Sequence, residues 1–208
     1  PRAIAAAWWA TLPSYLPLRI MFSTEFGTCL LGIARQTIAH ALGCAAVGVD
    51  TSAAWLAQPA ACFVTLTQYG QLRGCIGTLH AHRSLLDDLQ SNAVAAALHD
   101  PRFEPVKGDD LESLRIEVSV LSRPEALPVQ SEAALLASLR PHVDGLIVQD
   151  GVRRATFLPQ VWEQLPDTLD FVSRVKQKAG LPATAWSSSM HWQRYSVQKW
   201  SEPPIPLC

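Results

Sequence analysis

A thiol, a guanidinium and two glycines lie within seven consecutive positions, Leu72–Thr78. The thiolate is the nucleophilic and metal-binding form of cysteine, and a nearby guanidinium favours that form. We therefore interpret Cys75 as a candidate catalytic nucleophile or as a thiol at a metal or radical site. Arg73 would activate it and hold an anionic group of the substrate. The alternative interpretation is that Cys75 is a small hydrophobic residue inside a hairpin.

Two glycines flank this cysteine. Gly74 and Gly77 carry no side chains, so a substrate or a partner segment could approach the backbone closely, and we treat both as candidate substrate-binding residues. They could instead mark bulges in a buried hairpin. If the glycines bind a peptide and Cys75 is present for its size, the chain is an interaction module and not an enzyme.

Two further residues are candidates for substrate binding. Arg102 follows the helix-ending pair Asp100-Pro101, and its planar fork suits a carboxylate or a phosphate. It could instead pair with Glu117 or with another carboxylate. Glu117 lies on the polar face of a predicted strand, where an acid is either solvated or part of a site.

A catalytic cysteine usually works with a base, often a histidine. His80 and His82 directly follow the Cys75 segment at alternate positions, which would point the same way on a strand. No cysteine or carboxylate at fixed spacing completes a metal site around them, and we predict none. The sequence has no Gly-rich phosphate loop and no recognisable triad, so the cofactor is unknown.

The Cys75 segment is expected to form the second strand of a β-hairpin with Tyr69-Gly70 as its turn. With that two-residue loop, Cys75 pairs with Val64, and a one-residue change would alter the pairing. Arg73 and Cys75 share one face of the strand because side chains alternate.

Periodicity, capping residues and turn signals predict the other elements. Asp144-Gly145 and Asp150-Gly151 are predicted turns. Hairpins separated by helices, without regular β-α-β alternation, indicate an α+β fold. Helices are expected at 25–42, 84–99, 131–139, 159–164 and 167–179, and strands at 62–67, 72–78, 114–121, 146–149, 153–157 and 192–200.

The composition of the chain bears on its expected partners and location. The chain has 17 basic and 18 acidic residues without a basic cluster, so nucleic acid is not an expected partner. It has no apolar run of about 18 residues, so we predict no membrane span. Its five cysteines form no Cys-x-x-Cys pair, which is typical of reduced thiols and predicts a cytoplasmic protein.

The ends of the sequence differ from its middle. Residues 1–20 are rich in Ala and Trp and are interrupted by prolines, so we interpret them as an extra leader before a natural start at Met21. Residues 201–208 are a Pro-rich tail that is expected to be flexible. A single domain is predicted over 21–200.

The segment around Cys75 and several others, in order along the chain, resemble the AMMECR family, whose bacterial and archaeal members are called AmmeMemoRadiSam system protein A. The resemblance covers about residues 25–200. The matching segments are Phe63–Leu66, Gly70, Leu72–Leu79, Asp100–Phe103, Ile116–Leu121, Asp144–Leu146, Phe157–Trp162 and Lys178–Leu181.

The resemblance implies an α+β domain with a larger helix-on-sheet lobe, a smaller lobe and a cleft between them that contains the Arg73–Gly77 strand. It implies no established reaction. It also implies association with a Memo-like protein and a radical SAM protein, and hence a role in a modification system. The number of subunits is not predicted.

Overall fold

The computed structural model describes residues 24–204, which divide into two compact units. Among these residues, unit 1 comprises 24–120 and 198–204, and unit 2 comprises 121–197. The predicted leader, the predicted start at Met21 and the end of the predicted tail lie outside the described residues. No helix in the described range is long and apolar enough to cross a membrane.

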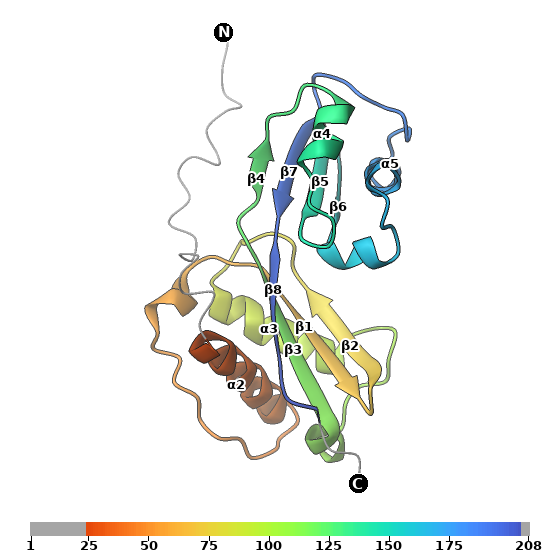
Figure 1. Ribbon diagram of the computed structural model, residues 1–208. Coiled ribbons are helices and arrows are strands. Elements are labelled where there is room, and N and C mark those ends of the chain that lie inside the picture. The colour runs from red at the N-terminus through yellow and green to blue at the C-terminus, as the bar shows by residue number, and fades with distance from the viewer. Residues whose placement is uncertain (1–23, 205–208) are drawn as a thin grey trace. The chain divides into compact units, whose positions relative to one another are not determined.

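Unit 1 is built on a four-stranded sheet of order β2-β1-β3-β8, with helices α2 and α3 packed beside it (Figure 1). The sheet places the Cys75 segment on β2, at one edge. The elements are α2 (Thr24–Ala41), the short 3-10 helix η1 (Ala54–Ala57), β1 (Cys62–Gln68), β2 (Gln71–Gly77), α3 (Leu85–Leu98), η2 (Gly108–Ser113), β3 (Leu114–Leu121) and β8 (Val197–Ser201).

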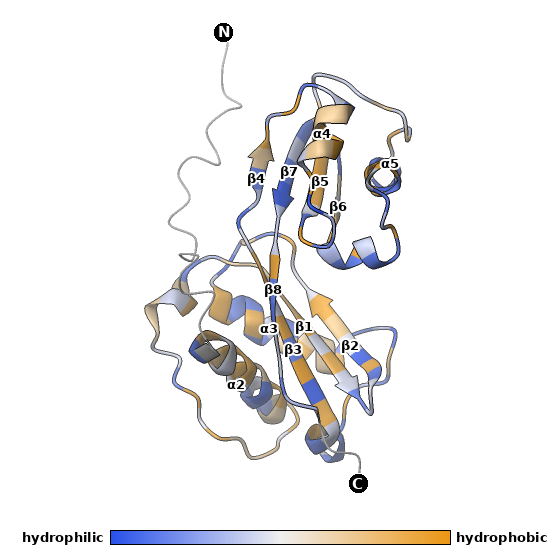
Figure 2. Cartoon of the chain, viewed as in Figure 1, coloured by the Kyte–Doolittle hydropathy of each residue, from blue (hydrophilic) through white to orange (hydrophobic). Residues whose placement is uncertain are grey.

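The core of unit 1 lies between the helices and one face of this sheet. Every second residue of β1 is buried, beginning at Cys62, and β3 begins with the same alternation. Hydrophobic residues therefore concentrate along these two strands (Figure 2). The opposite face carries their partly exposed residues, among them Thr65 and Glu117. Buried residues of α2 and α3 complete the core: Phe26, Leu30, Ile33, Ala34, Ile38, Leu85, Leu89, Ala93, Ala96 and Ala97.

Predicted helix boundaries in unit 1 are confirmed by their caps. The Ser84 hydroxyl accepts the backbone N–H of Asp87 at the start of α3. Gly43 follows α2 with a φ of 71°, a left-handed conformation that glycine adopts without strain. Both signals were present in the local sequence, which is why these ends could be predicted.

The hairpin turn is at Tyr69-Gly70 as predicted, but the predicted strand register is wrong. Thr65 pairs with Cys75, and Val64 does not. The register shifts after the pair Thr67 and Leu72, because Arg73 is an additional residue on β2 with no partner on β1. This β-bulge moves every later pair by one residue.

Unit 2 holds a second four-stranded sheet, of order β4-β7-β5-β6. The buried side chains of α4 and α5 pack with those of β5, β6 and β7, and Trp162 stacks on Phe171 at the centre of this core. The elements are β4 (Glu125–Leu127), α4 (Glu132–Ser138), β5 (Gly145–Asp150), β6 (Arg153–Phe157), η3 (Pro159–Glu163), α5 (Thr168–Lys178) and β7 (His191–Tyr195).

Two predictions in this part of the chain are wrong. Gly145 begins strand β5 and does not form a turn; a Cβ there would lie 2.5 Å from the Tyr195 ring, so the glycine permits close packing. The single strand predicted over 192–200 is two strands, β7 and β8, which belong to different sheets and meet at Ser196. The segment predicted as one strand therefore contributes one strand to each unit.

Candidate functional site

At Cys75, the edge of β2 is bound by a carboxylate and a guanidinium from the segment after α3. The Cys75 N–H donates to Asp100 Oδ2 at 2.8 Å, and Arg102 Nη2 donates to the Cys75 carbonyl oxygen at 3.1 Å. Both backbone groups that an edge strand would leave open are thus paired with side chains. These two hydrogen bonds hold the backbone of Cys75 in place at the edge of the sheet that β2 forms.

Asp100 and Arg102 also bind each other. Arg102 Nε lies 2.9 Å from Asp100 Oδ1, and Arg102 Nη2 lies 2.7 Å from Asp100 Oδ2. This bidentate pair, together with the N–H groups of Cys75 and Arg102, holds the pKa of Asp100 well below its usual range. Asp100 is therefore ionised at neutral pH although only 5% of its surface is exposed.

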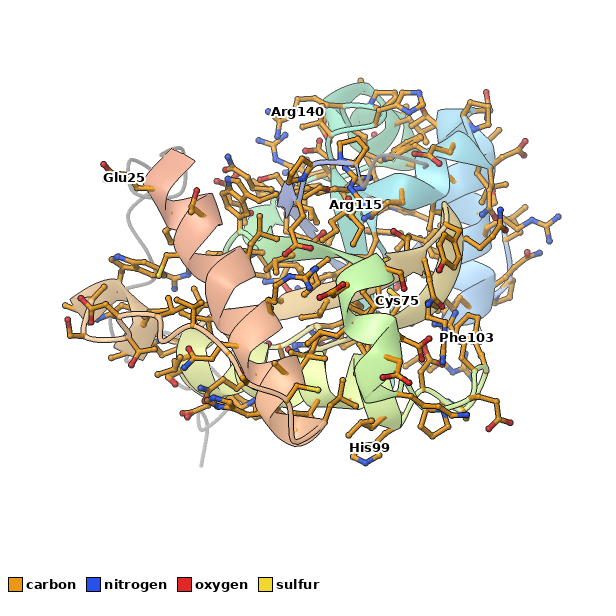
Figure 3. All side chains as sticks on the ribbon, turned by 90° about the horizontal axis from the view of Figure 1, so that it is seen from below. Glu25, Cys75, His99, Phe103, Arg115 and Arg140 are labelled. Atoms are coloured by element: carbon orange, nitrogen blue, oxygen red, sulfur yellow. The ribbon has the colours of Figure 1, made fainter. Side chains whose placement is uncertain are left out.

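The local fold explains how these residues reach β2. Helix α3 ends at Leu98, and the Phe103 N–H donates to the Asp100 carbonyl to form a tight turn. The Val106 N–H then returns to the carbonyl of Ala97. Figure 3 shows Phe103 on the same side of unit 1 as Cys75 and far from Glu25, and the Arg102 guanidinium lies 5.3 Å from the Phe103 ring centre.

The Cys75 sulfur lies beside a hydroxyl group. Thr65, its partner on β1, donates from Oγ1 to the sulfur at 3.3 Å. The guanidinium of Arg102 binds the backbone carbonyl oxygen of the same cysteine at 3.1 Å, and its hydrogen bond to Asp100 raises its pKa. Cys75 as a residue is partly exposed. A partly exposed cysteine whose sulfur accepts from a hydroxyl and whose carbonyl oxygen binds a guanidinium is a candidate for a reactive thiol.

Arg73 occupies a different place from the one its spacing suggested. Its guanidinium donates to the backbone carbonyl oxygens of Glu104 and Pro105, in the segment that follows Arg102. It therefore ties that segment to the bulge in β2. In the structure it is Arg102, and not Arg73, whose contacts include Cys75.

Gly74 and Gly77 are explained by packing within the chain. A Cβ on Gly74 would lie 2.1 Å from the carbonyl oxygen of Ala96, so helix α3 passes directly over this position. A Cβ on Gly77 would lie 2.2 Å from the Phe63 ring. Both glycines allow a close approach, but the group that approaches belongs to this protein.

Glu117 lies in line with the site, one strand beyond Thr65. Thr65 pairs with Cys75 on one side and with Glu117 on the other, so the three residues form a row across β2, β1 and β3. The Glu117 carboxylate accepts from Ser201 Oγ at 2.9 Å and lies 3.5 Å from Lys199 Nζ. The ion pair of Glu117 is with Lys199. Arg102 pairs with Asp100, so the alternative interpretation, in which Arg102 pairs with Glu117 or with another carboxylate, holds for another carboxylate.

The end of the Cys75 segment is anchored by a buried acid. Asp88 of α3 is fully buried, and its Oδ2 accepts from Thr78 Oγ1 at 2.6 Å and from the Cys62 N–H at 2.9 Å. Arg83 neutralises it through Oδ1 at 2.8 Å. This acid fixes the last residue of the segment and the first residue of β1 to the same helix.

His80 and His82 follow Thr78 in a short loop. Nδ1 of His82 lies 2.8 Å from the carbonyl oxygen of His80. Among the described residues, no group of three or more His, Cys, Asp or Glu side chains is arranged to bind a metal ion.

Asp100 and Thr65 were missed as site residues. Asp100 gave a signal, since it belongs to the segment Asp100–Phe103 that resembles the family, but the sequence suggested only a helix stop. Thr65 gave the same signal, since it belongs to the segment Phe63–Leu66 that resembles the family, but its contact with Cys75 depends on the bulge at Arg73.

Comparison with known proteins gives the chain its family. The family model described as AMMECR1 matches residues 31–200. The protein MJ0810 of Methanocaldococcus jannaschii is 31% identical over 186 residues, which cover 88% of this chain and 92% of that protein. A protein of Methanothermobacter thermautotrophicus is 46% identical over 121 residues, or 58% of this chain, and the match spans 63% of that protein's length.

A solved structure gives the same fold. The crystal structure of the uncharacterized protein PH0010 from Pyrococcus horikoshii matches with a TM-score of 0.72 and 30% identity. The match covers 88% of this chain and 94% of that one. It confirms the predicted α+β class. Since the family model spans most of the sequence and includes the whole site around Cys75, the chain belongs to the AMMECR1 family.

Proposed function

We propose that unit 1 carries a thiol-dependent site centred on Cys75, and that the protein acts as a cysteine-dependent enzyme or as the thiol component of a modification system. In this proposal Cys75 supplies the reacting sulfur. Arg102 and Thr65 position it and donate to it, and Asp100 positions Arg102. The substrate meets the sulfur on the partly exposed side of β2.

One observation carries this proposal: the Asp100–Arg102 pair holds both backbone groups of Cys75 and so brings a guanidinium to this residue. A cysteine that only fills space does not need a buried carboxylate on its own N–H. A reacting group does benefit from such fixation, because catalysis requires a preorganised position.

The alternative function, a peptide-binding module, is based on the expected space beside Gly74 and Gly77. In the structure that space is taken up by Ala96 and Phe63 of the same chain. The free edge of β2, where an extended peptide could add a strand, is occupied at Cys75 by Asp100 and Arg102. The glycines and the edge therefore give the alternative no support.

The test is the rate at which iodoacetamide alkylates each cysteine of the folded protein, measured by peptide mass spectrometry. The sulfur displaces iodide, forms a bond to carbon and loses its proton to solvent. Cys75 is expected to react faster than Cys29, Cys44 and Cys62. Burial raises the pKa of the Cys62 thiol well above its usual range, and burial with the nearby Asp50 raises that of Cys29, so these two are slow references.

Two variants with matched controls separate reactivity from exposure. Thr65→Val removes the hydroxyl that donates to the sulfur and keeps the shape of the side chain, and we expect slower labelling of Cys75. Arg102→Gln is expected to slow it as well. Arg140→Gln breaks a similar bidentate Arg–Asp pair with Asp144 in unit 2 and should leave the rate unchanged. Labelling of Cys75 no faster than that of Cys44 in the wild-type protein would contradict the proposal.

The system in which this thiol acts is proposed from the family resemblance alone: a Memo-like protein and a radical SAM protein as partners. The expected result is that tagged wild-type protein, expressed in its native host, copurifies with one or both of them. The Thr65→Val variant serves as a control for a folded protein with an altered site. Recovery of neither partner, from cells shown to contain both, would count against this association.

A further inference from the structure

The charges of the Asp100–Arg102 pair are unequally exposed. The Asp100 side chain is 2% exposed, whereas the Arg102 side chain is 53% exposed. Solvent therefore meets the guanidinium, and the carboxylate lies beneath it. A pair that is neutral as a whole therefore presents a positive surface next to Cys75, whose carbonyl oxygen the guanidinium binds.

The guanidinium also has donors that this pair does not use. The hydrogen bonds to Asp100 and to the Cys75 carbonyl use Nε and Nη2, and Nη1 takes no part in them. An arginine carries five N–H donors in a rigid fork. Because Asp100 holds one edge of this fork, the orientation of the Nη1 group is fixed before any ligand arrives, which lowers the entropic cost of binding.

The other charged groups along the row do not oppose an anion here. Glu117 lies one strand beyond Thr65, and Lys199 and Ser201 hold its carboxylate. Arg73 adds a second positive charge to the segment beside β2, where it is bound to two backbone carbonyl oxygens.

We infer that the substrate of the Cys75 site carries a carboxylate or a phosphate group close to the atom that the sulfur attacks, and that Arg102 binds this group through Nη1. The inference rests on the proposed function and adds the chemical class of the substrate. Arg102 thereby has two roles in the site, as the group that fixes Cys75 and as the group that selects an anionic partner for it.

Two alkylating reagents of nearly equal size test the inference. Iodoacetate is anionic and iodoacetamide is neutral, so the ratio of their rates at one cysteine reports the local preference for an anion. We expect this ratio to be about three- to fivefold higher at Cys75 than at Cys44, as expected for one charge pair near a protein surface. The preference should fall when KCl is raised to about 0.5 M, because salt screens exposed charges.

Arg102→Gln should reduce the ratio at Cys75 to that at Cys44, and Arg102→Lys should retain part of the preference because it keeps the charge. Arg140→Gln is the matched control and should not change the ratio. Should either Arg102 variant fail to fold, the salt dependence of the wild-type protein gives the same information. Acetate and inorganic phosphate, compared at equal ionic strength, are expected to slow iodoacetamide labelling of Cys75, and the stronger inhibitor identifies the preferred group.

The outcomes separate this inference from the proposed function. If Cys75 reacts quickly with iodoacetamide, shows the same ratio as Cys44 and is not protected by either anion, the anionic substrate is wrong and the thiol site stands. If Cys75 is slow with both reagents, the proposed function itself fails.

Discussion

Replacing Gly74 with alanine is expected to lower the free energy of unfolding by roughly 2–4 kcal/mol. The new Cβ would lie 2.1 Å from the carbonyl oxygen of Ala96, which is backbone in the last turn of α3 and has no flexible end that could move aside. Strand β2 or helix α3 must shift, and the core between them would lose packing. Urea unfolding followed by circular dichroism measures the change.

Gly48 provides the matched control for this substitution. It is an exposed glycine with open space around the position of its Cβ, so Gly48→Ala should change the stability by less than about 0.5 kcal/mol. Equal stabilities of the two variants would contradict the close packing of β2 on α3. In that case, a loss of partner binding in a Gly74 variant would be a direct effect on binding and not a result of a destabilised fold.

The hairpin shows how far local sequence could predict this site. The turn at Tyr69-Gly70 is indicated by Gly70, which takes a φ of 78° without strain, whereas the φ of 51° at Tyr69 is one that its residue type disfavours. The bulge at Arg73 does not follow from residue type. It depends on Asp100, Arg102 and the carbonyls of Glu104 and Pro105, which bind this edge of β2 from about thirty residues away in the sequence.

The same distinction applies to the residues of the site. Cys75 and Arg102 were both chosen from their side-chain chemistry, and the structure brings them together through the turn after α3. Gly74 and Gly77 were chosen because they leave space, but a sequence does not say which atoms fill it. Here Ala96 and Phe63 do, since the sheet and helix approach each other at these positions.

Helices with clear caps were predicted closely, and the last strands of the chain were not. The stretch 192–200 contains several residue types that favour strands, and no glycine or proline interrupts it. The structure assigns its two halves to β7 and β8 in separate sheets. In unit 1, Trp200 packs on Phe26, and Glu202 binds Arg35 at 2.6 Å, so the position of β8 is determined by contacts with α2.

Replacing Asp100 with alanine is expected to destabilise the protein by roughly 2–4 kcal/mol at neutral pH. The variant loses the acceptor for the Cys75 N–H and for the Arg102 guanidinium. The Cys75 N–H has to find water or remain unpaired, whereas Arg102 is exposed enough to be hydrated, which limits the loss. Urea unfolding at pH 7 measures the difference from wild type.

The pH dependence of that difference tests its electrostatic origin. An aspartate in an unfolded chain has a pKa near 3.9. In the folded protein the pKa of Asp100 lies below this value. Its contribution to stability is therefore complete above about pH 5 and is lost as the pH falls below about 4 toward the folded pKa. The gap between wild type and Asp100→Ala should shrink from pH 7 to pH 3. Asp109→Ala, which removes an exposed acid from the same region, should show almost no gap at either pH. A gap of constant size would mean that Asp100 stabilises β2 by its shape alone, and the ionised pair that positions Cys75 would then have to be abandoned.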